Sequence, residues 1–186
     1  MKRFLKLWLC LVFAAAMQAT AQTDKPVMHS YAFDDGGILT GMSDNGLWAV
    51  ASATNSSNTL ILENPRLLDV DGGTELLLSE GYEEGESLNC GANDVTNDGN
   101  VVVGRFGGLP AVWRRTGETS GAWTQLPVPD GYDGGMVNAV TPDGKYAVGV
   151  ATTSTNILLE KEVMWDVATN AILPTPGLPA KDAAHL

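Results

Sequence analysis

The histidines and cysteines of this sequence lack the partners that catalysis requires. His29 and His185 are the only histidines and lie near the two ends of the chain, while Cys90 has no neighbouring histidine, other base or second cysteine. A cysteine acts as a nucleophile through its thiolate, which a nearby base or positive charge must stabilise. We therefore expect Cys90 to be a small buried residue near the start of a strand, and both histidines to be exposed.

Two acidic stretches have side chains that could bind a metal or cleave a glycoside. Residues 69–75 hold closely spaced oxygen ligands of the kind calcium prefers, but Gly73 and Thr74 stand where an EF-hand loop needs an acidic residue or asparagine and then a glycine. Glu83, Glu84 and Glu86 lie on one stretch, whereas glycoside hydrolysis needs two carboxyl groups across a cleft. A turn between strands is predicted for residues 69–75, with no metal site, no catalytic residue and no cofactor.

Aromatic residues are the remaining candidates for ligand contact. Trp113 and Trp165 recur at one position of an internal repeat, which favours packing between repeats over stacking on a sugar. Tyr82 and Tyr132 each follow a glycine in the segments that connect one repeat to the next. Because binding residues are often carried by connecting loops, these two tyrosines are the candidate binding residues.

The repeat that positions these residues is a β-hairpin that occurs three times. It reads GMSDNGLWAVA at residues 41–51, DVTNDGNVVVG at 94–104 and AVTPDGKYAVG at 139–149. In each copy a serine or threonine opens a turn that ends in Gly46, Gly99 or Gly144, and an alternating apolar strand follows. Asn or Asp before Gly suits a tight turn, since these residues tolerate positive φ.

Two further apolar stretches follow each hairpin, so each unit is predicted to hold four strands. The third strand is expected at residues 59–62, 111–113 and 163–165, and the fourth at 76–78, 123–127 and 171–174. The turn glycines recur about every 50 residues, a period typical of four-stranded propeller blades.

The combined pattern of apolar-x-Ser/Thr-x-Asp-Gly, Val-x-Gly, Ala-x-Trp and a strand ending in Leu-Pro resembles the extracellular HAF repeat family. VMWDVATNAILPTPGLP, at residues 163–179, is the clearest copy, and the resemblance covers residues 41–179. The His-Ala-Phe triplet that names the family is replaced by Pro-Ala-Val at 110–112 and Glu-Val-Met at 162–164. TPDGKYAVG is also similar to hairpins of TolB and WD40-type propellers. These resemblances imply a β-propeller architecture and no single activity.

The predicted fold is therefore all-β, an array of four-stranded antiparallel propeller-like blades. A lead-in at 22–40 precedes three repeats, at about 41–92, 93–137 and 138–180, with a truncated C-terminal end. A closed propeller has four to eight blades, so three blades predict an incomplete propeller. Its open blade edges are expected to allow self-association.

The first 21 residues are typical of a secretory signal, which predicts export to the periplasm, the cell surface or the medium. They hold a basic start, an apolar run at 7–17 and Ala-Thr-Ala before the cleavage point. This apolar run is too short to span a membrane, and no later segment is long and apolar enough to do so. The net charge of −11 becomes more negative when the basic signal is removed, which argues against nucleic acid as a partner.

These observations favour an exported, non-enzymatic propeller-type binding or scaffold module whose partner is an extracellular protein or carbohydrate. One alternative is a fragment of an extracellular propeller enzyme acting on glycans, with its catalytic residues outside this chain. A second alternative is a purely structural exported protein. The absence of an assembled catalytic set from the sequence favours the first hypothesis.

Overall fold

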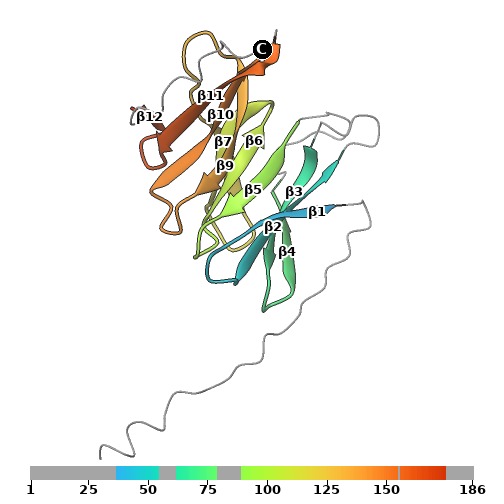
Figure 1. Ribbon diagram of the computed structural model, residues 1–186. Helices are drawn as coiled ribbons and strands as arrows, with labels where there is room; N and C mark the ends of the chain where they lie inside the picture. The colour runs from blue at the N-terminus through green and yellow to red at the C-terminus, as the bar shows by residue number, and fades with distance from the viewer. Residues whose placement is uncertain (1–36, 55–61, 79–88, 155, 175–186) are drawn as a thin grey trace, which may run out of the picture. The chain divides into compact units, whose positions relative to one another are not determined.

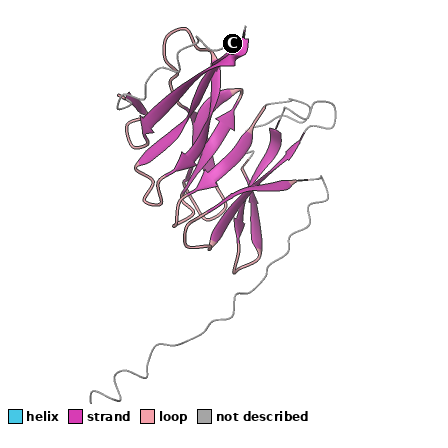
Figure 2. Ribbon diagram, viewed as in Figure 1, coloured by secondary structure: helices cyan, strands magenta, loops and turns pink. Residues whose placement is uncertain are grey.

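A computed structural model describes residues 37–54, 62–78, 89–154 and 156–174. The predicted signal sequence, both histidines and Tyr82 lie outside these residues. Every regular element in the described part is a β-strand, and no helix there is long and apolar enough to cross a membrane (Figure 2).

The strands form three four-stranded antiparallel sheets, called blades 1 to 3 here (Figure 1). Blade 1 contains β1 (Ile38–Met42), β2 (Trp48–Thr54), β3 (Leu62–Asp69) and β4 (Thr74–Leu77). Blade 2 contains β5 (Gly91–Val95), β6 (Val101–Phe106), β7 (Leu109–Arg115) and β8 (Gly121–Gln125). Blade 3 contains β9 (Gly134–Val140), β10 (Tyr146–Thr153), β11 (Asn156–Asp166) and β12 (Ala171–Leu173). Within each blade, strands that follow one another in the sequence are paired, which confirms the predicted all-β, propeller-type class.

The first hairpin turn of each blade is built by one hydrogen-bond pattern, which explains the repeated sequence. In blade 2, the Thr96 hydroxyl donates to Asp98 Oδ1 at 2.6 Å, and the same oxygen accepts the N–H of Asn100 at 3.0 Å. The N–H of Val101 donates to Thr96 Oγ1 at 3.1 Å. Gly99 closes the turn with φ 67°. The side chains thus satisfy backbone groups that the tight turn leaves unpaired.

The turns of blades 1 and 3 repeat this pattern with their own residues. The hydroxyl-to-oxygen distance is 2.8 Å from Ser43 to Asn45 and 2.7 Å from Thr141 to Asp143. Gly46 and Gly144 have φ of 72° and 71°. A neutral asparagine therefore does in blade 1 what an aspartate does in the other two blades.

The turn aspartates have lowered pKa values because their charged forms accept several hydrogen bonds. Bonds from Thr141 and Lys145 lower the pKa of Asp143 to about 2. Partial burial acts to raise the pKa of Asp98, but bonds from Thr96 and Asn100 outweigh it and leave that pKa below its ordinary value. Each carboxylate thus stabilises the fold above its unfolded pKa, and this contribution is lost as the pH falls through the folded pKa.

The double substitution Asp98→Asn and Asp143→Asn is expected to fold and to lose stability less steeply than the wild type between pH 5 and pH 2. An amide oxygen accepts the same turn bonds, as Asn45 does in blade 1, but it does not titrate. Urea unfolding at a series of pH values measures this difference. Parallel pH curves for the two proteins would show that the turn carboxylates do not carry the acid sensitivity.

The blades pack face to face through two apolar cores, one between each pair of successive blades. Because strand side chains alternate, each blade presents one face to the blade before it and the other to the blade after it. In β6, the neighbours Val102 and Val103 contribute to the first and the second core respectively. The first core consists of Val50, Leu67, Leu78, Ala92, Val95, Val102 and Trp113. The second core consists of Val103, Val112, Leu126, Val137, Ala147, Ala151, Val163, Trp165 and Val167.

The third strand of blade 1 lies later in the sequence than predicted. It was expected at residues 59–62, but β3 is Leu62–Asp69, and residues 59–61 lie outside the described part. The register places Leu68 opposite Ala49, as Trp113 lies opposite Val102 and Trp165 opposite Ala147. Blade 1 therefore has a leucine where the other blades have tryptophan. Because no tryptophan marks this position, the residue types alone do not identify the bounds of β3.

A bulge at one position of each first strand brings the backbones of the first two strands unusually close. The register skips Thr40 in β1, Asn93 in β5 and Asn138 in β9. Opposite the bulge, a Cβ added to Gly104 would lie 1.9 Å from the carbonyl oxygen of Gly91. A Cβ on Gly149 would lie 2.1 Å from the carbonyl oxygen of Met136. The glycine of the Val-x-Gly pattern is therefore required by this close approach in blades 2 and 3.

Hydrogen bonds between blades accompany the apolar cores. Asp94 Oδ2 in blade 2 accepts the N–H of Val140 in blade 3 at 2.8 Å, and Asp94 Oδ1 accepts the N–H of Val95 at 2.9 Å. Burial raises the pKa of Asp94 in spite of these bonds. The backbone N–H of Asn97 in blade 2 also donates across the interface, to the carbonyl of Pro142 in blade 3 at 3.1 Å. Polar pairing of this kind fixes the register of one blade on the next.

Candidate functional site

The connector between β8 and β9 holds Tyr132, the one predicted binding residue that the described part contains. Its chain turns at residues 129–132, where the N–H of Tyr132 donates to the carbonyl of Pro129 at 3.1 Å. Gly131 has φ 86°, the conformation that a type II turn requires at its third residue. The indole N–H of Trp165 donates to the carbonyl of Pro127 at 2.8 Å and fixes the start of the connector on the core. Hydrogen bonds at Pro127 and Pro129 thus hold the connector just before Tyr132.

Asp133 anchors the other end of the connector to blade 3. Its N–H donates to the carbonyl of Thr152 at 3.1 Å. Its Oδ1 accepts the N–H of Ser154 at 2.6 Å, and its Oδ2 accepts the hydroxyl of Ser154. These bonds from the Ser154 hydroxyl and N–H hold the pKa of Asp133 below its ordinary value. The carboxylate is therefore ionised and held in place at neutral pH.

The tyrosine ring lies at the surface with one side on the apolar core. Tyr132 is partly buried and packs against the core between blades 2 and 3. Lys161 Nζ, from β11, lies 6.0 Å from the ring centroid, at the limit of a cation–π contact. Glu160 and Glu162 flank this lysine on the same strand and are exposed. The group of Tyr132, Asp133, Ser154 and Lys161 is called the connector surface below.

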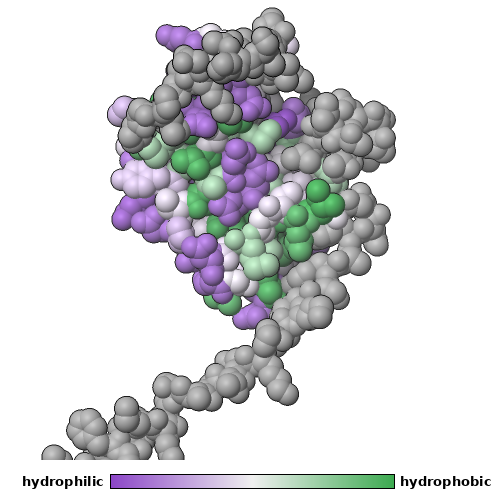
Figure 3. All heavy atoms as spheres, in the orientation of Figure 1, coloured by the Kyte–Doolittle hydropathy of each residue, from purple (hydrophilic) through white to green (hydrophobic). Residues whose placement is uncertain are grey.

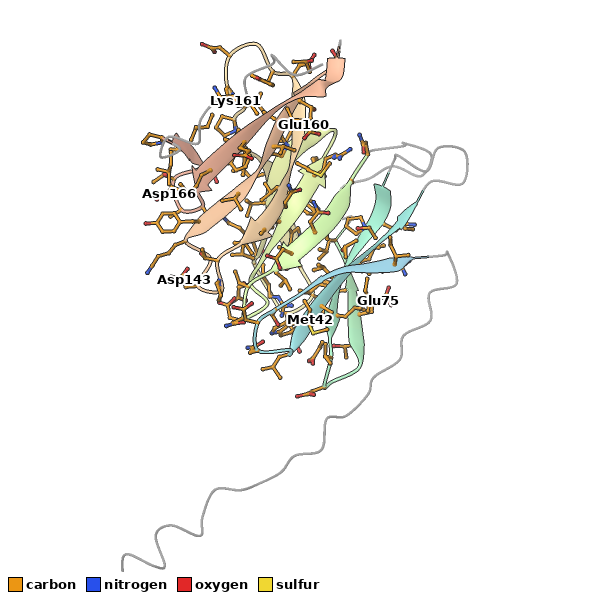
Figure 4. All side chains as sticks on the ribbon, in the orientation of Figure 1. Met42, Glu75, Asp143, Glu160, Lys161 and Asp166 are labelled. Carbon is orange, nitrogen blue, oxygen red and sulfur yellow. The ribbon has the colours of Figure 1, made fainter. Side chains whose placement is uncertain are left out.

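The connector surface and the hairpin turn of blade 3 lie at opposite ends of the blade. Asp143 precedes β10, whereas Lys161 pairs with Ala151 near the end of that strand. Figure 4 shows Asp143 apart from Lys161 and Glu160, which lie together. The three repeated glycines, Gly46, Gly99 and Gly144, therefore lie in the hairpin turns, whereas the candidate binding residue Tyr132 lies in a connector between blades.

The connector surface offers contact area and hydrogen-bonding groups, and Asp133 is a poor candidate for a general base. A serine nucleophile needs a base that can take its proton near neutral pH, and a carboxylate whose pKa is lowered is a poor base. Asp133 is such a carboxylate, so its bond with Ser154 positions the loop. Within the part of the chain that the structure describes, no three His, Cys, Asp or Glu side chains are grouped to hold a metal. An aromatic ring beside a cation and an anion provides contact area together with donors and acceptors.

Of the remaining sequence candidates, those within the described residues occupy packing or turn positions, whereas Glu83, Glu84 and Glu86 lie outside the described residues. Trp113 and Trp165 are 2% and 0% exposed, in the first and second core respectively. Cys90 is buried directly before β5. Asp69 accepts the N–H of Gly72 at 2.8 Å through Oδ1, within the turn between β3 and β4. Tyr82 is not among the described residues, so the structure does not place it beside Tyr132.

The sequence alone does not identify the other members of the connector surface, Asp133, Ser154 and Lys161. They lie on three separate segments, which only strand pairing brings close together. The register of β9, β10 and β11 places Thr152 opposite Gly134 and Ala151 opposite Lys161. One sequence signal pointed to Asp133, since an acidic residue follows the tyrosine in both connectors, as Glu83 after Tyr82 and Asp133 after Tyr132.

Solved structures of TolB proteins are among those that are similar to this chain. One is described as TolB from Agrobacterium tumefaciens, with 17% sequence identity and a TM-score of 0.48, covering 74% of this chain and 48% of that one. The other is TolB from Acinetobacter baumannii, with 17% identity and a TM-score of 0.43, covering 75% of this chain and 31% of that one. This chain thus spans about half the length of the first structure and about a third of the second.

No protein-family model matches the chain, and no curated protein matches it. The resemblance to HAF repeats consequently stays a sequence-based prediction. The architecture is defined by the chain's own blades, their shared bulges and turns, and the two cores between them. The described part of this chain forms a propeller-type array of three four-stranded antiparallel blades.

Proposed function

We propose that this protein is an exported propeller-type binding or scaffold module of HAF-type repeats, without catalytic activity of its own. Its connector surface takes the ligand, which is an extracellular protein or carbohydrate. The observation that carries the proposal is the anchoring of the connector, in which Asp133 is bound to Thr152 and Ser154 and the adjacent Tyr132 ring lies beside Lys161.

An anchored connector favours binding because little conformational freedom is lost when a ligand arrives. A loop that is ordered only on binding spends part of the interaction energy on its own ordering. Tyrosine adds a rigid ring with a polar end, and this combination is enriched at the centres of interfaces. The mixed charges of Lys161, Glu160 and Asp133 suit a neutral or polar ligand better than a polyanion, which the negative net charge of the chain repels.

The proposal is tested by probing carbohydrate and protein arrays with the full chain and then titrating any ligand found. We expect Tyr132→Ala and Lys161→Ala to weaken binding, by about tenfold or more for the tyrosine. Tyr132→Phe keeps the ring and separates loss of stacking from loss of the hydroxyl group.

Lys145→Ala is the matched control, because Lys145 is also an exposed lysine of blade 3 but lies in the hairpin turn at the other end of β10. The control variant should bind as the wild type does. Arrays without a ligand, or a ligand whose affinity is unchanged by all connector variants, would contradict the proposal.

A further inference from the structure

Arg105 lies near the end of β6, and its guanidinium has only neutral partners among the described residues. One terminal nitrogen donates to Asn89 Oδ1 at 3.0 Å, and the other donates to the sulfur of Met136 in blade 3 at 3.6 Å. The Nε of Arg105 is buried and has no acceptor in the described part of the chain. Because a thioether sulfur is a weak acceptor, most of the five N–H donors of this side chain are left without a good partner.

The packing of the blades does not require an arginine at this position. The registers place Ser52, Arg105 and Val150 at one position of the second strand in blades 1, 2 and 3. Ser52 is fully buried, and its hydroxyl oxygen accepts the N–H of Ala92 in the next blade at 2.9 Å. A small polar residue and an apolar residue thus fill this position in the other two blades. The cation in blade 2 therefore has no counterpart in the repeat that would explain it as a packing residue.

Partial burial of an unpaired guanidinium is unfavourable, because this group stays charged in proteins. Burial accordingly lowers the pKa of Arg105 from its ordinary value. Arg66 of blade 1, by contrast, forms an ion pair with Glu75 at 3.0 Å. An anion that accepted the remaining N–H groups of Arg105 would offset the cost of burying it.

Asn89 is held beside the guanidinium by its own backbone. It has φ 36°, in the left-handed region that residues other than glycine adopt at a cost. Its carbonyl accepts the N–H of Gly108 at 3.3 Å, and the carbonyl of Gly108 accepts the N–H of Gly135 in blade 3 at 3.1 Å. The Oδ1 of Asn89 is occupied by Arg105, whereas its Nδ2 has no acceptor among the described residues. This side-chain amide therefore remains a donor for a ligand.

Arg105 lies at the same end of the blades as the connector surface. It is near the end of β6, and Ser154 follows the end of β10, the equivalent strand of blade 3. Arg105 is partly buried, so the end of its side chain can be reached from solvent. Hydrophobic residues lie among hydrophilic ones on the side of the molecule that Figure 3 shows. A surface of this mixed kind suits a small polar ligand better than a large apolar partner.

A single carboxylate group fits the donors of Arg105. Its two oxygens can accept two parallel N–H bonds from a guanidinium. The net charge of −11 repels a polyanion strongly, but a ligand with one negative charge much less. The free amide of Asn89 can donate to a hydroxyl group beside the carboxylate. A uronic acid, which is a sugar with one carboxylate among hydroxyl groups, combines these features.

We propose that Arg105 and Asn89 form a binding site for the carboxylate of a uronic acid. The guanidinium binds the carboxylate, and the Asn89 amide donates to a neighbouring hydroxyl group of the sugar. The site names an acidic sugar as part of a carbohydrate ligand, and in this respect it rests on the proposed function. Its residues are distinct from Tyr132 and Lys161, so the two sites can be tested apart.

The test titrates the full chain with glucuronate, and with glucose as the matched neutral sugar. NMR follows the side-chain N–H signals of Arg105 and Asn89, which detects weak binding. Glucuronate is expected to shift both signals and to bind about tenfold or more tightly than glucose, the ratio expected for a charge-assisted hydrogen bond.

Three variants at the site make the result specific. Arg105→Ser introduces the residue that blade 1 has at this position, so it should fold and lose the preference for glucuronate over glucose. Arg105→Lys keeps the charge without the paired donors and should retain only part of that preference. Asn89→Gly preserves the left-handed backbone and removes the amide, so it should weaken binding several-fold.

The control variants keep the site intact. Tyr132→Ala, Lys161→Ala and Lys145→Ala should each bind glucuronate as the wild type does. Circular dichroism establishes that every variant is folded, and the signals of the wild type test the site even if a variant does not fold.

Several outcomes would overturn the proposal. Side-chain signals that glucuronate leaves unchanged would do so, as would equal affinities for glucose and glucuronate. Loss of glucuronate binding in Lys161→Ala but not in Arg105→Ser would assign the carboxylate to the connector surface. A glutamate-containing peptide that shifts the Arg105 signal, where glucuronate does not, would make the ligand a protein. Ligands found on arrays that depend on Tyr132 can persist in the first three cases, so the two proposals fail separately.

Discussion

Replacement of Trp165 by alanine is expected to lower the free energy of unfolding by about 3–5 kcal/mol, the range found when a large aromatic side chain is removed from a core. Trp165 is fully buried between blades 2 and 3, and its indole N–H also holds the carbonyl of Pro127. Its loss would leave a cavity and an unpaired carbonyl at the connector. Urea unfolding followed by circular dichroism measures the change.

Trp165→Phe separates the two contributions of the tryptophan. It keeps most of the packing but not the hydrogen bond, whose net value is about 1 kcal/mol. This variant should therefore be clearly more stable than the alanine variant. A loss below about 1.5 kcal/mol for Trp165→Ala would mean that blades 2 and 3 do not share the core described here.

Gly104→Ala is expected to destabilise the protein by about 3 kcal/mol, at the upper end of the usual range for overpacking. The added Cβ would lie 1.9 Å from the carbonyl oxygen of Gly91 and 2.9 Å from its carbon. Both are backbone atoms of the paired strand β5, so the clash cannot be relieved by turning a side chain. The measurement is the shift of the urea midpoint relative to the wild type.

Gly46→Ala is the matched control for the glycine prediction. Gly46 has φ 72°, and an added Cβ there would meet nothing within 4 Å. Its cost comes from the left-handed backbone alone, about 1–2 kcal/mol. Equal losses for the two glycine variants would show that the close approach at the bulge is absent.

The hairpin turns could be predicted from the sequence because their determinants are local. Thr96, Asp98 and Gly99 lie within four residues, and the hydroxyl, carboxylate and positive φ act on the same short loop. Four strands per unit followed from the apolar stretches for the same reason.

The third strand of blade 1 was wrongly placed because its position depends on a partner strand. Leu68 pairs with Ala49 as Trp113 pairs with Val102, and only this pairing shows that the two residues are equivalent. A leucine by itself does not mark that position in the sequence. The connector surface was incompletely predicted for a similar reason, since Ser154 and Lys161 reach Tyr132 and Asp133 through the pairing of β9, β10 and β11. Contacts that depend on register between distant segments have no local sequence signature.

The face-to-face stacking of the blades is the central claim, and amide hydrogen exchange read residue by residue tests it most directly. Three backbone N–H groups donate to an acceptor in a neighbouring blade. That of Asn97 donates to the carbonyl of Pro142, that of Gly135 to the carbonyl of Gly108, and that of Val140 to the carboxylate of Asp94. Stacked blades predict that these three amides exchange as slowly as the amides of the central strands β6 and β10. Fast exchange at all three, with β6 and β10 still protected, would mean that each sheet folds without its neighbours and would contradict the propeller-type arrangement.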